Sequence, residues 1–280
     1  MGYKTISLIA TDTATDGPAL RAALGIAARE EAALEIYCVG IDPAHYDALS
    51  VGAVAVTVEA AINEARARAG GVAAWVKDNI PAGTARVSVQ EVVSPQLGLD
   101  FTVSRVARYS DLVVATQPYG PGRDTTQVTL VEAALFATGA PVLVVPEAEV
   151  DWSRPFGRVL VAWNESDVSF AAIRAAMPIL KAAETVDIIM VDPPSHSPER
   201  SDPGGSVSLM LARHGVKTEV SILARTLPRV SEIILRFARD HGAEAVVMGA
   251  YGHSRFREAI LGGATREMLE GAHVPLLMAH

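Results

Sequence analysis

The stretch EAVVMGAYGHSRFREAILGGATREML, residues 244–269, joins an apolar run to a helical pattern through a glycine-rich loop. Its first five residues are typical of a buried strand, and a helix is expected to begin near Ala264. Gly249 and Gly252 are separated by two residues, and Gly262 follows after nine more. Backbone N–H groups converge where such a loop enters a helix, and glycine lets a phosphate approach them closely. The pattern predicts an α/β unit with a phosphate loop, although the same glycines also suit a turn, a C-cap and a helix start.

Short apolar runs alternate with helical patterns on both sides of this loop. The runs are rich in Val, Ile and Leu without clean alternation, which indicates strands covered on both faces and hence a mostly parallel sheet. The expected strands are Thr5–Ala10, Leu34–Val39, Arg86–Val93, Asp111–Ala115, Pro141–Val145, Arg158–Trp163, Thr185–Val191, Lys217–Leu223, Glu244–Met248 and Val274–Met278. The predicted fold class is α/β, with two tandem doubly wound, mostly parallel five-stranded sheets.

The two halves of the chain repeat each other. DLVVATQP (111–118) resembles EAVVMGAYG (244–252), and GAPVLVVPE (139–147) resembles AHVPLLMAH (272–280). The spacing of these repeats predicts an insertion of about 18 residues in the first half, in the Ala-rich stretch Ala53–Asn79. The polar, Pro-flanked segment 147–154 predicts a boundary between domains at 1–146 and 155–280.

The first domain is expected to be a degenerate copy of the second. None of the loop glycines recurs at the matching positions, although Asp12 keeps an acid at the end of the first strand. We therefore expect this half to be structural or regulatory.

Composition excludes several classes of function. The net charge of -8 argues against a general nucleic-acid binder and against attraction to anionic membranes. No apolar stretch approaches the roughly 18 residues that span a bilayer. The single cysteine, Cys38, cannot form an internal disulfide and fits a buried position in a cytoplasmic protein. The scattered histidines form no metal-binding spacing, and there is no G-x-S-x-G motif, so neither metal ligands nor catalytic residues are assigned.

The glycine spacing resembles the ATP-binding members of the universal stress protein family, which carry Gly-x2-Gly-x9-Gly followed by Ser or Thr. Gly263 stands where the hydroxyl residue is expected, with Thr265 two residues later. The segment GRVLVAWNESDVSFAAIRAAMPIL (157–180) looks like the family's first strand and helix. The chain as a whole is similar to tandem universal stress proteins, which implies an adenine nucleotide α-hydrolase-like fold.

This resemblance implies ATP, with or without Mg, in the second domain. In the family, the residue that ends the first strand lies at the nucleotide, and the end of the second strand holds the adenine through its backbone. The expected nucleotide-binding residues are Asn164, Ser166, Val191, Asp192, Gly249, Gly252, His253, Arg255, Gly262, Gly263 and Thr265. Other interpretations stay open: Asn164 also suits a helix cap, Asp192 a turn, and His253 and Arg255 solvated positions.

The expected function is a regulatory stress-response protein that binds ATP and at most hydrolyses it slowly. One alternative is a protein-interaction scaffold without nucleotide, since Asn164 and Gly263 depart from the family's pattern. Another is an enzyme of the adenine nucleotide α-hydrolase type. The last strands of the two halves are expected to meet, so that the halves mimic a dimer within one chain. A homodimer or a protein partner is left open.

Overall fold

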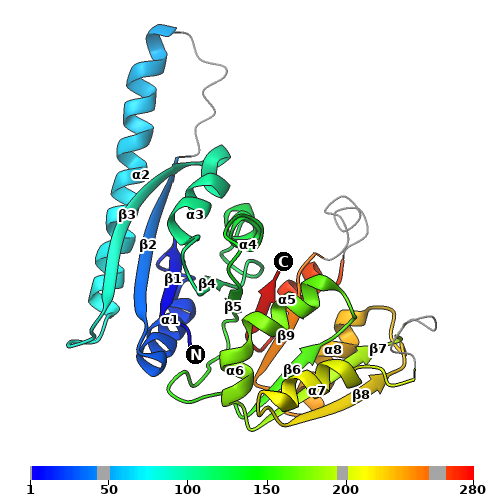
Figure 1. The fold of residues 1–280 in the computed structure, drawn as a ribbon. Helices are drawn as coiled ribbons and strands as arrows, with labels where there is room; N and C mark the ends of the chain where they lie inside the picture. Colours follow the sequence, from blue (N-terminus) through cyan, green and yellow to red (C-terminus); the bar gives the residue numbers. More distant parts are fainter. Residues whose placement is uncertain (1, 43–50, 194–200, 252–262) are drawn as a thin grey trace. The chain divides into compact units, whose positions relative to one another are not determined.

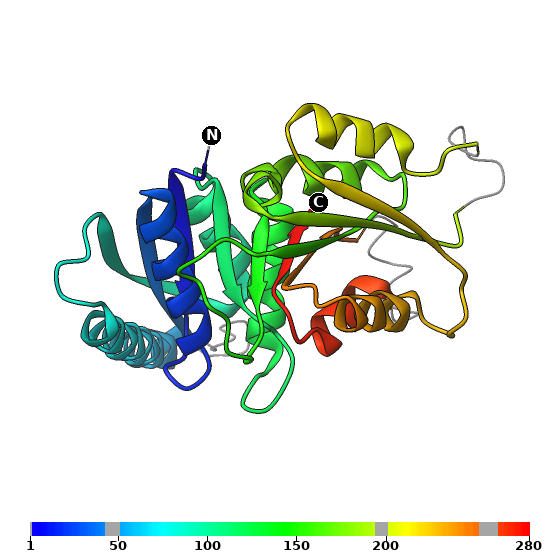
Figure 2. The same cartoon turned by 90° about the horizontal axis from the view of Figure 1, so that it is seen from below.

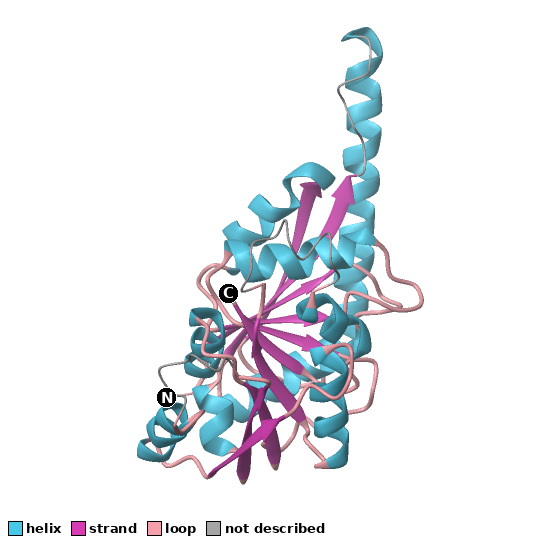
Figure 3. Ribbon diagram, turned by 90° about the vertical axis from the view of Figure 1, so that its right-hand side faces the viewer, coloured by secondary structure: helices cyan, strands magenta, loops and turns pink. Residues whose placement is uncertain are grey.

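A computed structural model describes residues 2–42, 51–193, 201–251 and 263–280 of the chain. The chain divides into two compact units, Tyr3–Ala140 and Pro141–His280, with Gly2 joined to the second. Each unit is an α/β layer structure in which helices lie on both sides of the strands (Figure 3). The predicted fold class is confirmed, since all the strand pairs within each unit are parallel except one.

The first unit contains four parallel strands in the order β3-β2-β1-β4. Its elements are β1 (Thr5–Ala10), α1 (Gly17–Glu30), β2 (Ala33–Asp42), α2 (Val51–Asn79), β3 (Val87–Pro95), the 3-10 turn η2 (Gln96–Gly98), α3 (Leu99–Ala107), β4 (Leu112–Thr116) and α4 (Thr125–Ala137). The central strands β1 and β4 are buried almost throughout, whereas β3 is an edge strand with exposed residues.

The second unit contains six strands in the order β8-β7-β6-β9-β10-β5. Its elements are β5 (Val142–Val145), β6 (Arg158–Ala162), α5 (Asp167–Ala175), α6 (Met177–Ala182), β7 (Thr185–Val191), α7 (Gly205–Arg213), β8 (Thr218–Leu223), α8 (Val230–Asp240), β9 (Ala245–Gly249), α10 (Ala264–Gly271) and β10 (Leu276–Ala279). Helices α8 and α10 pack side by side, in orange and red in Figure 2.

The last strands of the two halves meet, as predicted. β5 pairs with β10 in an antiparallel register that places Val144 opposite Leu276 and Leu143 opposite Leu277. All four of these side chains are buried, so the pairing covers the apolar edge that each strand would otherwise present. This contact makes β5 part of the second compact unit although it ends the first repeat of the sequence.

The inserted residues lie where the repeat spacing predicts. α2 is 29 residues long, whereas its counterpart α7 has 9 residues (Figure 1). Pro178 marks a break between two helices, because α5 ends at Ala175 and α6 begins at Met177 with the proline in its first turn. Within the described ranges, no helix combines the length and apolar character that a membrane crossing requires.

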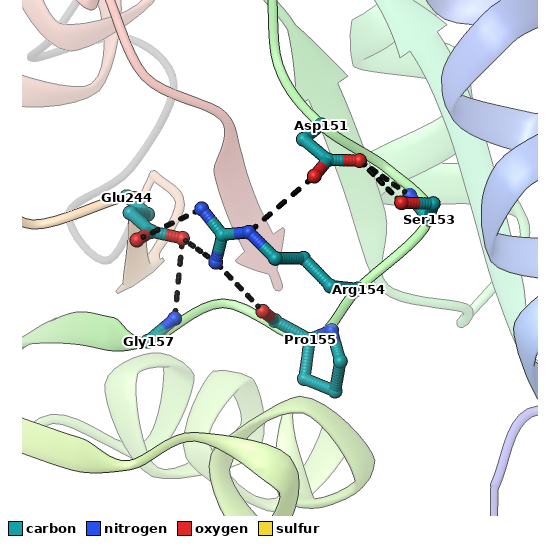
Figure 4. A network of polar contacts seen from close by, with 6 residues as sticks. All are labelled: Asp151, Ser153, Arg154, Pro155, Gly157 and Glu244. Carbon is teal, nitrogen blue, oxygen red and sulfur yellow. Dashed lines mark hydrogen bonds and ion pairs between the residues drawn. The ribbon is translucent and has the colours of Figure 1, made fainter.

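A polar network holds the segment that leads from β5 to β6 (Figure 4). Arg154 donates from Nη1 to Oε2 of Glu244 at 3.0 Å, and the same carboxylate accepts the Gly157 N–H at 3.1 Å. Asp151 lies 3.4 Å from the guanidinium on its other side. Trp152 is buried against Phe156 with its ring edge-on. This segment, expected from the sequence to be an irregular linker, is therefore fixed to the second unit.

Candidate functional site

The candidate site lies at the carboxyl ends of β6 and β9. These strands are parallel neighbours, with Ala162 opposite Met248, so the chain leaves both of them at the same edge of the sheet. The sheet order 3-2-1-4-5 of the second repeat reverses between these two strands. Ligands of open α/β sheets bind at such a reversal point. Asn164 and Gly249 therefore flank one edge position, as the sequence predicted.

Asn164 forms a tight turn rather than a helix cap. Its Oδ1 accepts hydrogen bonds from the Ser166 N–H at 3.2 Å and from the Ser166 hydroxyl at 2.6 Å. Ser166 itself caps α5, since its Oγ accepts the Ser169 N–H at 3.2 Å. The interpretation of Asn164 as the cap is therefore wrong. Its oxygen is used within the turn, which leaves the amide NH2 of this exposed residue to face a ligand.

Gly249 is required by packing. A Cβ atom at this position would lie 2.6 Å from the backbone nitrogen of Ser169 and 2.7 Å from the carbonyl carbon of Val168. The first turn of α5 therefore rests directly on the end of β9. This is a role in helix–strand packing, which the glycine spacing alone did not distinguish from close approach of a phosphate.

Gly263 and Thr265 form the start of α10. Gly263 is the N-cap residue, with φ -68° and ψ 157°, and has no side chain with which to cap the helix. Thr265 is buried, and its hydroxyl oxygen accepts the Tyr251 N–H at 3.0 Å. The hydroxyl thus ties the end of β9 to the first turn of α10.

Val191 and Asp192 end β7, next to β6. The Asp192 N–H donates to the Leu223 carbonyl at 2.9 Å, so the edge strand β8 already uses this donor. Asp192 has a φ of 48°, which turns the chain away from the sheet at this point. The remaining expected residues, Gly252, His253, Arg255 and Gly262, lie outside the described part of the chain.

An aromatic pair adjoins the site and was not predicted. Trp163 follows β6, and its ring meets Phe170 of α5 edge-on at 6.3 Å between centroids. The Arg174 guanidinium lies over the Phe170 ring at 4.7 Å from its centre. The indole N–H of Trp163 is buried, and no described residue accepts a hydrogen bond from it. The sequence carried no signal for this edge-on aromatic pair.

The first half carries its own carboxylate at the equivalent turn. Asp16, four residues after Asp12, is buried and accepts the N–H groups of Thr11 and Asp12 at 2.7 and 2.9 Å. It also accepts the Thr116 hydroxyl at 2.6 Å. Burial raises the pKa of the Asp16 carboxyl, while the hydrogen bond from Thr116 opposes that shift. The residue four after Asn164 is the apolar Val168, so the second half has no carboxylate at this position.

A second carboxylate closes the N-terminus of α4. Asp124 accepts the Thr126 N–H at 2.7 Å, and the Gln127 side chain accepts the Asp124 N–H at 2.9 Å. This capping box satisfies donors that would otherwise be open to an anion. Comparing the sequences of the two halves showed that the loop glycines are absent from the first half. It did not identify Asp16 or Asp124 as the residues that accept these N–H groups.

The first half nevertheless keeps space at its strand ends. A hollow of about 320 Å³ is lined by Asp12, Arg68, Gln96 and Asp124, among other residues. Arg68 donates to the Ile41 carbonyl at 2.8 Å and pairs with Glu64, so its charge is shared with groups of its own chain. Two carboxylates at the rim, one of them closing the terminus of α4, make this hollow unfavourable for a phosphate.

Comparisons with known proteins identify a family for the second half of the chain. Residues 155–280 match the model of the universal stress protein family. A universal stress protein of Synechocystis is 30% identical over 90 residues, which are 32% of this chain and 30% of the relative. The matched part thus spans less than a third of that relative's length.

Solved structures extend the similarity in fold to the whole chain. A universal stress protein of Archaeoglobus fulgidus aligns with a TM-score of 0.70 at 17% identity, over 98% of this chain and 95% of its own. A putative universal stress protein of Pseudomonas aeruginosa aligns with a TM-score of 0.60 at 15% identity, over 99% and 93%. At these identities, the two alignments support the fold alone.

Proposed function

Residues 155–280 of this chain match the universal stress protein family, and from that premise we propose that the second half binds ATP as a regulatory ligand. The phosphates lie at the N-terminus of α10, and the adenosine lies toward Asn164 and the end of β7. The first half binds no nucleotide phosphate. In this role the nucleotide is sensed by the protein rather than turned over.

One contrast supports the proposal most strongly. The helix that follows the fourth strand begins with a capping carboxylate in the first half, Asp124, and with a bare glycine in the second, Gly263. An uncapped helix N-terminus presents free N–H groups and the positive end of the helix dipole. An anion is stabilised there, whereas in the first half the protein's own carboxylate already occupies the equivalent position.

The Asn164 turn supports the placement of the adenosine. Because its oxygen is held by Ser166, the orientation of the carboxamide is fixed and its NH2 group can donate to a ligand. Trp163 and Phe170 add an aromatic wall beside this position. The residue at 263 supplies no hydroxyl to a phosphate oxygen, which weakens binding by about 1 kcal/mol, or several-fold in affinity.

A scaffold that binds no nucleotide is the second candidate. It is favoured by the polar groups that the protein already uses itself: the Asn164 oxygen, the Asp192 N–H and the Thr265 hydroxyl. Titration calorimetry with ATP–Mg separates the two candidates. We expect binding with a dissociation constant below about 1 mM. Absence of heat at millimolar ATP would favour the scaffold.

The substitution Gly263→Asp tests the placement of the phosphates. It copies the capping carboxylate of α4 into α10, at a φ of -68° that side chains readily adopt. We expect the carboxylate to compete with the phosphates and to weaken ATP binding at least about ten-fold, while leaving folding stability unchanged or slightly higher.

Gly263→Asn is the matched control. It offers a similar cap without the charge, so it should retain most of the affinity. Equal losses in the Asp and Asn variants would indicate steric blocking and not anion competition. Unchanged binding in both variants would place the phosphates elsewhere.

A further inference from the structure

An apolar stripe lies on the outer face of α3 and the turn η2 that precedes it. The side chains of Leu97, Phe101 and Tyr109 are 76%, 71% and 80% exposed. They are three of the six large apolar side chains that are exposed among the described residues. The opposite face of α3 is buried, and Ser104 on its flank donates to the Ala137 carbonyl at the end of α4 at 2.8 Å. The stripe is therefore the solvent side of a firmly packed helix.

Charges are ordered along this stripe. Asp100 is exposed in the first turn of α3, and Arg105 and Arg108 are exposed near its end. The Arg108 guanidinium lies 5.7 Å from the centre of the Tyr109 ring. The stripe thus carries negative charge near one end and positive charge near the other, with exposed apolar side chains at Leu97, Phe101 and Tyr109.

We infer that this stripe, Leu97–Tyr109, is a contact surface for a second copy of the same chain. A symmetric contact pairs the same patch on both copies. Turning one helix end for end about a point near Ser104 brings its Asp100 beside the other copy's Arg108, and its Phe101 beside the other copy's Arg105. The stripe is therefore complementary in charge to the same stripe of a second copy. The cation–π attraction between Phe101 and the other copy's Arg105 favours the same arrangement.

Other observations favour a second copy over other partners. The last strand edges are unavailable for pairing between chains, because β5 and β10 pair with each other. The chain's net charge of -8 makes nucleic acid a poor partner for a stripe with only two arginines. The contact would bury on the order of 1,000 Å² in total, which is near the lower limit for a specific interface. Because the stripe lies on the first unit and the residues of the proposed nucleotide site lie on the second, this dimer does not depend on nucleotide binding.

Sedimentation velocity of the full chain between about 1 and 100 µM tests this inference. The wild type should show a reversible monomer–dimer equilibrium, and Phe101→Glu should be monomeric across the range. Asp100→Arg should weaken dimerisation at least ten-fold. Adding Arg105→Asp and Arg108→Asp to Asp100→Arg should restore dimerisation, since the charge order is then reversed in both copies.

Val220→Glu on the edge strand β8, at a residue 39% exposed, is the matched control and should dimerise like the wild type. Dissociation by Val220→Glu with no effect of Phe101→Glu would assign the interface to β8 and overturn the inference. A wild type that stays monomeric at 100 µM would also overturn it. So would a monomeric chain whose melting temperature falls with Phe101→Glu, because the stripe would then be covered within its own chain.

Discussion

At the scale of single residues, the two halves differ in whether a carboxylate of the protein accepts the backbone N–H groups at the helix starts beside the strand ends. Asp16 and Asp124 occupy, in the first half, donors that lie at the β1–α1 turn and at the start of α4. The second half has the uncharged residues Ser166 and Gly263 as the N-caps of the related helices, α5 and α10. Under the proposed function, the protein's own carboxylates take the place of a bound anion in the first half, because backbone donors left without any acceptor would be costly.

The buried Asp16 carboxyl gives a prediction about pH. Its pKa is raised by burial, so the folded state binds the proton more tightly than the unfolded state does. The stability that follows from this difference is present at acidic pH and is lost as pH rises from the unfolded pKa of about 4 through the raised folded pKa. A ten-fold difference in proton affinity between the two states is worth about 1.4 kcal/mol.

Asp16→Asn should remove this loss, since an amide cannot ionise. The free energy of unfolding of the wild type should fall, relative to the variant, across that pH range and then stay level. Urea denaturation of both proteins from about pH 3.5 to 8 measures the difference. A wild type that instead gains stability over the variant as pH rises would show that the three hydrogen bonds outweigh the cost of burial.

At the scale of elements, strands could be predicted well and sites less well. All ten predicted strands are found, with ends displaced by at most three residues, because buried parallel strands carry an unbroken apolar signal. Helix caps depend on side-chain geometry, and for this reason the sequence left open whether Asn164 caps α5, a role that Ser166 fills. Gly249 was singled out correctly, but its packing against Ser169 depends on tertiary contact that spacing does not encode.

The long helix α2 offers a prediction at this scale. At Gly40 of β2, a Cβ atom would lie 1.8 Å from the carbonyl oxygen of Ala65, so α2 rests directly on the strand backbone. Gly40→Ala should displace the helix and lower the free energy of unfolding by about 3 kcal/mol or more.

Gly71 within α2 serves as the control, because a Cβ atom there meets nothing within 4 Å. Gly71→Ala should raise stability by about 0.5–1 kcal/mol through the higher helix propensity of alanine. Chemical denaturation monitored by circular dichroism measures both variants. If Gly40→Ala were as stable as the wild type, the contact between α2 and β2 would be looser than described.

At the scale of the whole molecule, the sequence repeat and the compact units divide the chain differently. The repeat predicts domains of 1–146 and 155–280, which places β5 with the first half. The compact units divide between Ala140 and Pro141, which places β5 with the second. The sequence repeat assigns β5 to the first half by its position in the chain, whereas the compact unit assigns it to the second half because it pairs with β10. The fold of each repeat was therefore predictable from the sequence pattern. The pairing of β5 with β10 was expected only from family resemblance.

This difference predicts how fragments should behave. A fragment of residues 141–280 keeps β5, Trp152 and Arg154, whereas a fragment of residues 155–280 loses all three. Without β5, the edge of β10 is left open beside the buried Leu276 and Leu277. Open apolar edges pair with other chains, so the shorter fragment should form dimers or larger species, while the longer one stays monomeric. The unfolding free energy of the shorter fragment should be lower by at least about 3 kcal/mol, the equivalent of two buried aliphatic side chains.

Light scattering and urea denaturation of the two fragments measure these properties. The α3 stripe, Leu97–Tyr109, is absent from both fragments, and both keep β8, so association of the shorter fragment beyond that of the longer one reports on β10. Both fragments also retain Asn164, Gly263 and Thr265, which makes ATP titration a check that each is folded around the proposed site. A shorter fragment that is monomeric and as stable as the longer one would mean that β5 adds nothing to the second unit. The division of the chain would then follow the sequence repeat.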